Sequence, residues 1–322
     1  MHPPSERTTP APQPATPQST RAPRITLRAD LRASWVDGLI AVVITAGLFA
    51  LIWARITSGA SSTATVMPFM AEDPRAFWLY FLSQAFGWSA LLWAWGTVLL
   101  GLLLSGRRPS WLRISATRLE RLHRTTSLNT MILIAAHALL FAAELIRFDD
   151  DSWPAATWTA FVEAFVPGGY QSGTGRIAIP VGQAALYLAI PLGLLFYVRH
   201  RIGPKTWRVM HRFVIVVYVL SVWHTLLYGT NVWYDGWFRT TIWLLQIPVA
   251  LLLLARLMRP ARRSERLPAV SAASSKPLWG VRLTGRVAAA GVVAALLAVV
   301  LSGHDGGRQQ PPEDTSSSHE HD

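Results

Sequence analysis

The sequence predicts an all-α integral membrane protein, in which a six-helix bundle is followed by one appended C-terminal transmembrane helix. Apolar residues make up 51% of the 322-residue chain, and charged residues only 15%. The apolar residues gather in seven long runs, separated by polar and basic connections. Most of these runs approach the roughly 20 residues that a helix needs to cross the hydrocarbon core of a bilayer. Helices are the expected form, because an open sheet edge cannot satisfy its backbone groups in lipid.

The seven runs follow one another with short connections. They are Val36–Ile56, Phe77–Leu104, Thr125–Ile146, Ile177–Val198, Phe213–Gly229, Thr241–Met258 and Val287–Ser302. The last run is the shortest. Three prolines, Pro180, Pro191 and Pro248, lie inside runs, where a missing N–H group and a ring clash predict kinks.

Polar segments set the boundaries around these runs. We expect a disordered cytoplasmic tail at 1–34, the six-helix domain at 35–259, a cytoplasmic linker at 260–284, the seventh transmembrane helix at 285–303 and a disordered external tail at 304–322. The tails contain few large apolar residues and therefore bury too little to fold alone. Between the third and fourth runs, Trp153–Val166 is expected to form a short amphipathic helix on the outer surface.

Arginine and lysine are unevenly distributed over the connections. Most of the 30 basic residues lie before the first run, in 105–124, in 199–212 and in 256–286, all on the same side of the predicted bundle. The positive-inside rule places that side in the cytoplasm of a bacterial-type cell (inner) membrane. The N-terminus is then cytoplasmic and, after seven crossings, the C-terminus external. This placement accounts for the net charge of +12, so we expect the lipid bilayer and not nucleic acid as the partner.

Cysteine is absent from the chain. Its absence excludes disulfides, iron–sulfur clusters, thiolate-ligated haem and covalently attached c-type haem. Any metal must therefore be held mainly by histidine, by carboxylates or by a cofactor.

Four of the histidines lie in or at the edge of two apolar runs. His123 and His137 belong to the third run, and His211 and His224 to the fifth. The members of each pair are separated by about 20 Å along a helix. Since both runs cross the membrane in the same direction, His123 and His211 share an inner depth, and His137 and His224 share an outer depth.

Two neutral imidazoles that face each other at one depth suit the axial ligation of a haem iron. Two such levels predict two stacked haems in the bundle. Arg124 and Arg212 directly follow the two inner histidines, where their guanidinium groups can pair with haem propionates. The alternative is that these histidines only pack or form hydrogen bonds between helices. The 13-residue spacing of the fifth run also turns its histidines about 140° apart on a regular helix, unless that helix is locally distorted.

At these residues the sequence resembles the ferric-reductase transmembrane family. That family includes NADPH oxidases, ferric reductases and the haem-binding membrane subunit of bacterial periplasmic methionine-sulfoxide reductases. The resemblance rests on the two spaced histidine pairs, on Thr174-Gly-Arg-Ile-Ala, and on Trp207-Arg-Val-Met-His211-Arg followed by His224. It covers roughly residues 36–258. It implies a six-helix domain that carries two b haems, with His123, His137, His211 and His224 as axial ligands, and moves electrons across the membrane.

The sequence departs from the large members of that family in two ways. They continue after the sixth helix into a flavin- and NADPH-binding module, whereas here no GxGxxG motif follows a predicted strand. Flavin is therefore expected only through a partner, so the donor is a separate cytoplasmic flavoprotein reductase or quinol. The acceptor would be an external metal chelate, a periplasmic oxidoreductase or oxygen. The seventh helix is the second departure.

Two alternatives stay open at this point. The chain could be a non-redox seven-helix transporter or assembly factor that uses its intramembrane histidines for proton or metal passage.

The second alternative concerns Glu144. This residue, seven residues beyond His137, could position a metal substrate or tune the outer haem. A simple ion pair between Glu144 and Arg147 at the end of the helix is the favoured interpretation.

Overall fold

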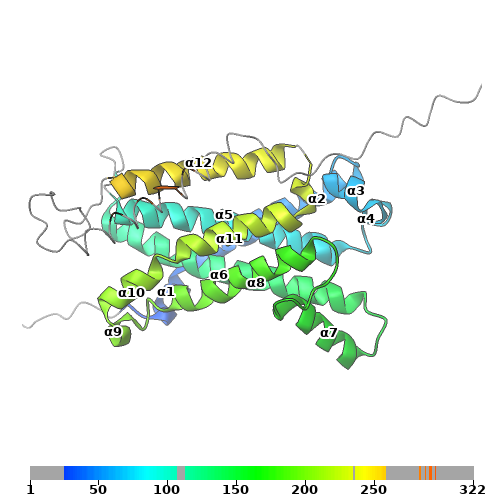
Figure 1. Cartoon of the computed structure of the whole chain (residues 1–322), viewed down its shortest axis with the longest axis horizontal. Helices are drawn as coiled ribbons and strands as arrows, with labels where there is room; N and C mark the ends of the chain where they lie inside the picture. Colours follow the sequence, from blue (N-terminus) through cyan, green and yellow to red (C-terminus); the bar gives the residue numbers. More distant parts are fainter. Residues whose placement is uncertain are drawn as a thin grey trace, which may run out of the picture.

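The computed structural model describes residues 25–106, 113–234 and 236–258, together with Leu283, Val287, Ala290, Gly291 and Ala294. Within these residues the regular structure is helical, and six helices are long and apolar enough to cross a membrane. The chain is therefore a multi-pass, all-α integral membrane protein (Figure 1). The seventh helix expected at 285–303 and the external tail lie almost wholly outside the described residues, as does the linker at 260–284.

The six described spans confirm the first six apolar runs. They are α2 (Trp35–Thr57), α5 (Trp78–Ser105), α6 (Ala116–Arg147), α8 (Gly175–Leu194), α10 (Pro204–His211) with α11 (Val214–Tyr228), and α12 (Trp237–Met258). α6 begins earlier than its apolar run because Ser115 caps it, with its side-chain oxygen accepting a hydrogen bond from the backbone of Arg118. The three prolines lie inside α8 and α12.

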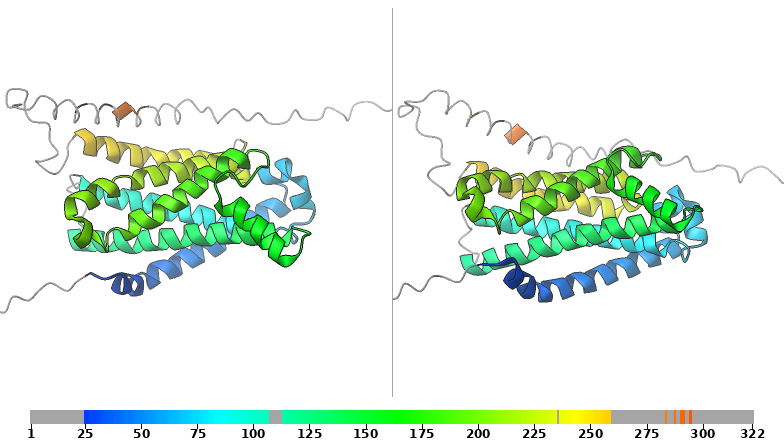
Figure 2. Two further views of the ribbon diagram at one scale, coloured as in Figure 1. Left: turned by 60° about the horizontal axis from the view of Figure 1, so that its bottom comes forward. Right: turned by 90° about the horizontal axis from the view of Figure 1, so that it is seen from below.

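The long helices run side by side, with α5 at the centre of the bundle (Figure 1). α5 packs most extensively against α6 and also contacts α2, α11 and α12. α8 packs against α11 and closes the other side of the space between α6 and α11. Figure 2 shows α2 and α12 on opposite flanks of this arrangement. The histidine-bearing helices α6, α10 and α11 thus lie beside two apolar supports, α5 and α8.

Short helices gather at the two ends of the bundle (Figure 1). α3 (Ser62–Val66), α4 (Pro68–Glu72), α7 (Trp153–Phe165) and η1 (Thr230–Val232) lie at one end, called here the outer end. α1 (Leu27–Ala33) and α9 (Arg199–Ile202) lie with α10 at the other, called here the inner end. α7 confirms the short helix expected between the third and fourth runs: Ala156, Ala160 and Ala164 are buried, whereas Trp153 and Trp158 are exposed.

Part of the segment expected to be a disordered tail at 1–34 is folded. Residues 27–33 form α1, which the Thr26 side chain caps and which packs against α6 and α2. Asp30 in this helix is buried, with an exposed fraction of 4%. Composition did not reveal this helix because its anchor is a polar contact to a distant part of the chain, Arg124.

Candidate functional site

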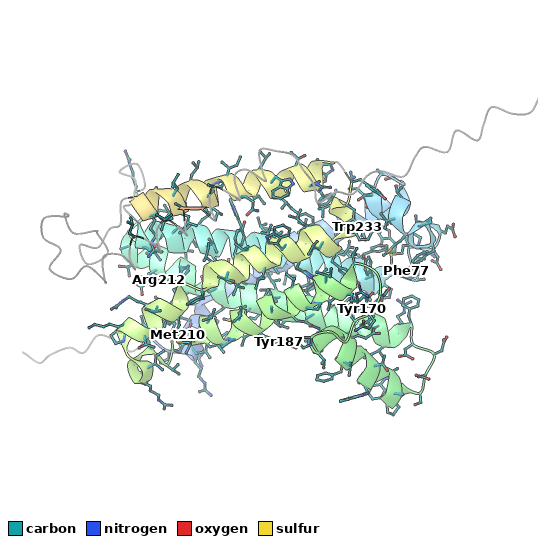
Figure 3. The ribbon with its side chains drawn as sticks, in the orientation of Figure 1. Phe77, Tyr170, Tyr187, Met210, Arg212 and Trp233 are labelled. Atoms are coloured by element: carbon teal, nitrogen blue, oxygen red, sulfur yellow. The ribbon has the colours of Figure 1, made fainter. Side chains whose placement is uncertain are left out.

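The four histidines meet as two pairs. The ring centroids of His123 and His211 are 5.9 Å apart at the inner end, and their planes are inclined by 85°. Those of His137 and His224 are 6.0 Å apart toward the outer end, with planes inclined by 70°. We call these the inner pair and the outer pair. In Figure 3 the two ends of the bundle can be recognised from two labelled residues. Arg212, which directly follows His211 in the sequence, lies toward the inner end, and Tyr170 lies at the outer end.

The fifth span is broken between its two histidines. α10 ends at His211, the chain turns through Arg212 and Phe213, and α11 begins at Val214. Of the two options that the 13-residue spacing left open, histidines turned apart or a locally distorted helix, the break corresponds to the second. Because α10 and α11 are separate helices, both histidines point toward α6 although a single regular helix would turn them apart.

Backbone carbonyls orient three of the four rings. The Nδ1 atom of His123 lies 3.0 Å from the Thr97 oxygen, that of His137 lies 2.7 Å from the Ser83 oxygen, and that of His224 lies 2.8 Å from the Ala178 oxygen. A carbonyl only accepts, so each Nδ1 carries the proton and donates it. The lone pair of a neutral ring is then on Nε2, which is free to bind a metal.

His211 is held differently. Its Nδ1 atom has no hydrogen-bond partner, and its ring stacks instead on Trp207, with centroids 5.3 Å apart and planes inclined by 24°. The outer pair has a similar neighbour one turn beyond it, since Tyr228 stacks on His224 at 6.0 Å and 27°. Each histidine of the fifth span therefore has an aromatic side chain against one face.

Glycines on the supporting helices make room for the rings. A Cβ atom added to Gly182 would lie 2.6 Å from Nδ1 of His224. One added to Gly87 or Gly101 would lie 3.1 Å from His137 or 3.2 Å from His123. These distances are shorter than normal carbon contacts, so a larger residue at these positions would displace the imidazoles.

Each pair borders a cavity, and the two cavities differ in size and charge. The outer cavity measures about 130 Å³ and has no charged side chain in its wall. The inner cavity measures about 360 Å³. Its charged lining residues are Glu120, Arg124, Arg208, Arg212 and Arg256. The inner cavity is thus the one suited to an anionic group.

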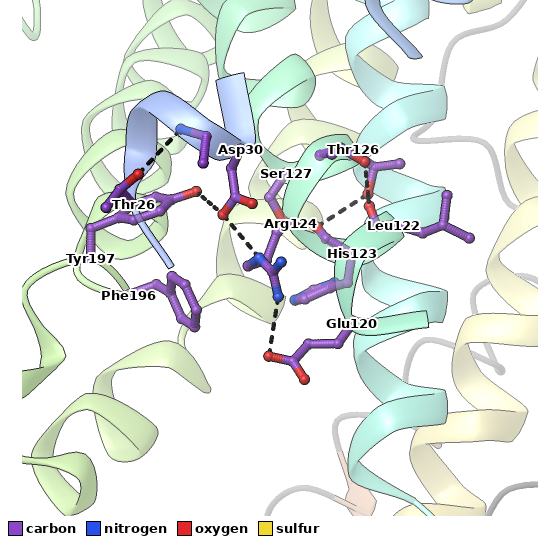
Figure 4. Close-up of polar contacts among 12 residues, drawn as sticks. Thr26, Asp30, Glu120, Leu122, His123, Arg124, Thr126, Ser127, Phe196 and Tyr197 are labelled. Carbon is purple, nitrogen blue, oxygen red and sulfur yellow. Dashed lines mark hydrogen bonds and ion pairs between the residues drawn. The ribbon is translucent and has the colours of Figure 1, made fainter. Parts of the chain in front are cut away.

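The two arginines predicted beside the inner histidines both border the inner cavity. Arg212 is exposed in the turn between α10 and α11. Arg124 is mostly buried and pairs with two carboxylates: Nε lies 2.9 Å from Asp30, and an Nη atom lies 3.2 Å from Glu120 (Figure 4). Arg124 is therefore already held by the protein, which the sequence did not indicate.

Glu144 does not make the ion pair that was favoured from the sequence. Its carboxylate is buried without a hydrogen bond of normal geometry, and the ion pairs found in the described part of the chain do not include it. The guanidinium group of Arg147 lies over the ring of Phe148 instead, 5.5 Å from its centroid. The direct ion pair is therefore not formed, although Arg147 lies close enough to act on the charge of Glu144. Glu144 also does not line the outer cavity.

Several residues of the site were missed from the sequence. Gly87 and Gly101 are spaced by the same 14 residues as His137 and His123, the rings they admit. This matched spacing on two consecutive spans is a signal that was present in the sequence. Trp207 belongs to the motif that carries the resemblance, but its stacking on His211 was not foreseen. Arg256 gave no signal, because its place beside the inner cavity depends on how α12 packs.

Residues 90–222 match the family model of the ferric reductase like transmembrane component. Over this stretch the chain is similar to that transmembrane component. The ferric-reductase-like stretch runs from α5 into α11 and includes His123, His137 and His211, while His224 lies just beyond it. Neither the curated proteins nor the solved structures give a match.

Gly182→Ala should destabilise the protein. The new Cβ atom pushes the ring of His224 away from the Ala178 carbonyl, which overpacks the core and breaks a buried hydrogen bond. We expect a loss of about 1–3 kcal/mol in the free energy of unfolding, read as a lower melting temperature in detergent.

Gly96→Ala in α5 is the matched control. No atom lies within 4 Å of its added Cβ, so this substitution should be neutral or stabilising by about 0.5–1 kcal/mol through helix propensity. Equal melting temperatures for the two variants would contradict the close approach at Gly182.

Proposed function

We propose that this protein carries electrons across the membrane through two haem b groups, from a cytoplasmic donor to an acceptor on the outer face. One haem would lie between His123 and His211, the other between His137 and His224. The observation that carries the proposal is the pairing of four intramembrane histidines at two levels. The ferric-reductase-like match supports transmembrane electron transfer as the general function.

The spacing of the rings fits a metal ion held between them. An ion bound to two imidazole nitrogens at about 2 Å each puts the ring centroids about 6 Å apart. The two observed separations are 5.9 and 6.0 Å. In the described part of the chain, no group of three or more histidine, aspartate or glutamate side chains is placed to hold a metal ion. Two protein ligands are enough for haem iron, because the porphyrin supplies the remaining four nitrogens.

The protein's own residues would do most of the tuning. A bound haem supplies a one-electron couple at each level. The carbonyls of Thr97, Ser83 and Ala178 fix the rings of three histidines and make their Nε2 atoms more basic. The arginines of the inner cavity would pair with propionates there. The apolar wall of the outer cavity keeps charged groups away from the outer haem.

The proposed direction of transfer follows from the charges at the two ends. The inner end presents exposed basic residues on α6, α9 and α10, among them Arg121, Arg201 and Lys205. The outer end carries the acidic run Asp149–Asp151. By the positive-inside rule the inner end faces the cytoplasm, where a flavoprotein reductase or quinol would donate. An external metal chelate, a periplasmic oxidoreductase or oxygen would accept at the outer end.

Purified protein should show the absorption spectrum of low-spin, six-coordinate b haem, with two haems per chain. His137→Leu or His224→Leu should remove the outer haem, and His123→Leu or His211→Leu the inner one, because each substitution deletes an axial ligand. Pyridine haemochrome absorbance per chain measures the loss.

His200→Leu is the control for these variants. His200 is exposed on α9, outside both cavities, and its substitution should leave two haems. Colourless wild-type protein, or full haem content after loss of both outer histidines, would sink the assignment. Colourless protein would instead favour a non-redox transporter.

Reporter fusions should show the proposed orientation. A reporter inserted after Ser172, in the exposed connection between α7 and α8, should be active only outside the cytoplasm, and one placed near residue 270 only inside. Alkaline phosphatase and a fluorescent protein, which work on opposite sides of a bacterial membrane, make a complementary pair. The reverse result would turn the direction of electron transfer around.

The isolated chain should not oxidise NADPH. A nicotinamide delivers a two-electron hydride, a haem takes single electrons, and a flavin normally stands between them. A dinucleotide-binding domain is built on a parallel sheet, whereas the described residues contain no strand. In stopped-flow absorbance, the haems should be reduced only after a cytoplasmic flavoprotein or quinol is added. Docking of an acidic partner on the basic inner end should weaken as salt rises.

Rapid haem reduction by NADPH alone would contradict this expectation. It would mean that the chain contains a nucleotide site of its own.

A further inference from the structure

α1 is fixed to the inner end of the bundle by a single buried carboxylate. Asp30 is 4% exposed, although it lies on a helix of only seven residues near the start of the described chain. Its Oδ2 atom accepts two hydrogen bonds, one from Nε of Arg124 and one from the hydroxyl of Tyr197, both at 2.9 Å (Figure 4). A buried carboxylate without such partners would be costly, so these contacts, together with the packing of α1 on α6 and α2, hold α1 in place.

Both partners of Asp30 belong to the wall of the inner cavity. Arg124 comes from α6, next to His123, and Tyr197 comes from the segment between α8 and α9. Asp30 itself does not line the cavity. One carboxylate behind the wall therefore ties together three segments of the chain: α1, α6 and the end of the fourth span.

The contacts leave Arg124 little freedom. Its Nε atom binds Asp30, an Nη atom lies 3.2 Å from Glu120, and the guanidinium carbon is 5.8 Å from the centroid of Phe196. Burial and the nearby Asp30 carboxylate raise the pKa of Tyr197 above its ordinary value, so its hydroxyl stays protonated and donates. The planar guanidinium group is thus held in one orientation at the cavity wall.

We propose that Asp30 is a positioning residue of the inner site, which holds Arg124 and Tyr197 in the cavity wall and offsets part of the positive charge around the inner histidine pair. The positioning of Arg124 and Tyr197 concerns the protein alone. The charge effect rests on the proposed function, because it concerns a haem bound between His123 and His211.

The charge effect has a definite sign. Four arginines and one glutamate line the inner cavity, and Asp30 adds one negative charge directly behind Arg124. Buried charges are screened much less than surface ones. Neutralising Asp30 leaves the cavity more positive, which favours the state of the haem that holds one more electron. The outer cavity has no charged lining and lies at the other level, so it should feel little of this change.

The test is Asp30→Asn in the full haem-loaded chain, followed by a redox titration that resolves the two haems by absorbance. The inner haem is identified as the one lost in His123→Leu. At a fixed potential its ratio of reduced to oxidised form should rise about tenfold, which is about 59 mV for a one-electron couple. The outer haem should keep its midpoint potential.

Asp37→Asn is the matched control. The Asp37 carboxylate also accepts hydrogen bonds near the start of a helix, from Trp93 at 3.2 Å and from Asn129 at 2.5 Å. Unlike the partners of Asp30, these two residues line neither cavity. Neutralising Asp37 should leave the inner potential unchanged. A general loosening of the bundle would act alike in both variants.

Tyr197→Phe provides a second variant with the opposite sign. It removes one donor from Asp30, which leaves the carboxylate charge less compensated and should lower the inner midpoint potential. A merely structural disturbance would not separate the two variants by sign. In haem-free protein, trypsin should cut α1 at the exposed Arg28 and Arg32 faster in Asp30→Asn than in Asp37→Asn, because the helix has lost its anchor.

The outcomes separate the two proposals. Wild-type protein without haem overturns the proposed function and with it the charge effect. Two bound haems, with an inner potential equal in Asp30→Asn and Asp37→Asn, overturn only the role of Asp30. An equal shift of both haems also overturns it, because a charge at the inner wall cannot act equally on both levels.

Discussion

The structure depends on placing four imidazole rings inside an apolar helix bundle. A ring in this position needs space and an acceptor for its N–H group, since lipid and apolar side chains offer neither. For three of the four rings, α5 and α8 supply both from the backbone: glycines open the space, and carbonyls about one turn away accept the proton. The order of packing follows from this requirement. α5 lies against α6, α8 lies against α11, and the two histidine-bearing spans face each other between them.

The inner and outer levels are built on the same plan and differ in charge. Both have a histidine pair near 6 Å and an aromatic ring stacked on the histidine of the fifth span. Only the inner level is surrounded by arginines, and only there does one histidine lack a carbonyl partner: His211, at which α10 ends. The break aligns His211 with His123 and also exposes Arg212 in the turn. One local feature thus contributes both to the ring alignment and to the basic character of the inner level, although Arg124, Arg208 and Arg256 come from the helices themselves.

Hydropathy predicted the six described spans because crossing a bilayer imposes a length and a composition that a single sequence displays. The histidine pairs were predictable for a related reason: ionisable residues are rare inside such spans, and the spacing of two histidines on one helix translates directly into a difference in depth. The glycine supports were harder to find, since a glycine in an apolar run acquires meaning only once the register of the neighbouring helix is known. α1 and the surroundings of Glu144 could not be predicted, because they depend on contacts such as Asp30 with Arg124, 94 residues apart. Whether Val287–Ser302 forms a seventh span stays a prediction.

The separation of the two levels along the membrane normal gives the proposed transfer an electrical character. The histidines of α6 are 14 residues apart, which is about 20 Å of helix in a hydrocarbon core of about 30 Å. An electron that passes outward between them therefore crosses roughly two thirds of the membrane potential, worth about 1.5 kcal/mol at 100 mV. With the cytoplasm negative, this step runs downhill and depolarises the membrane. The energised state of the cell would then drive the reaction at the outer face, even where the two haems have equal intrinsic affinity for the electron.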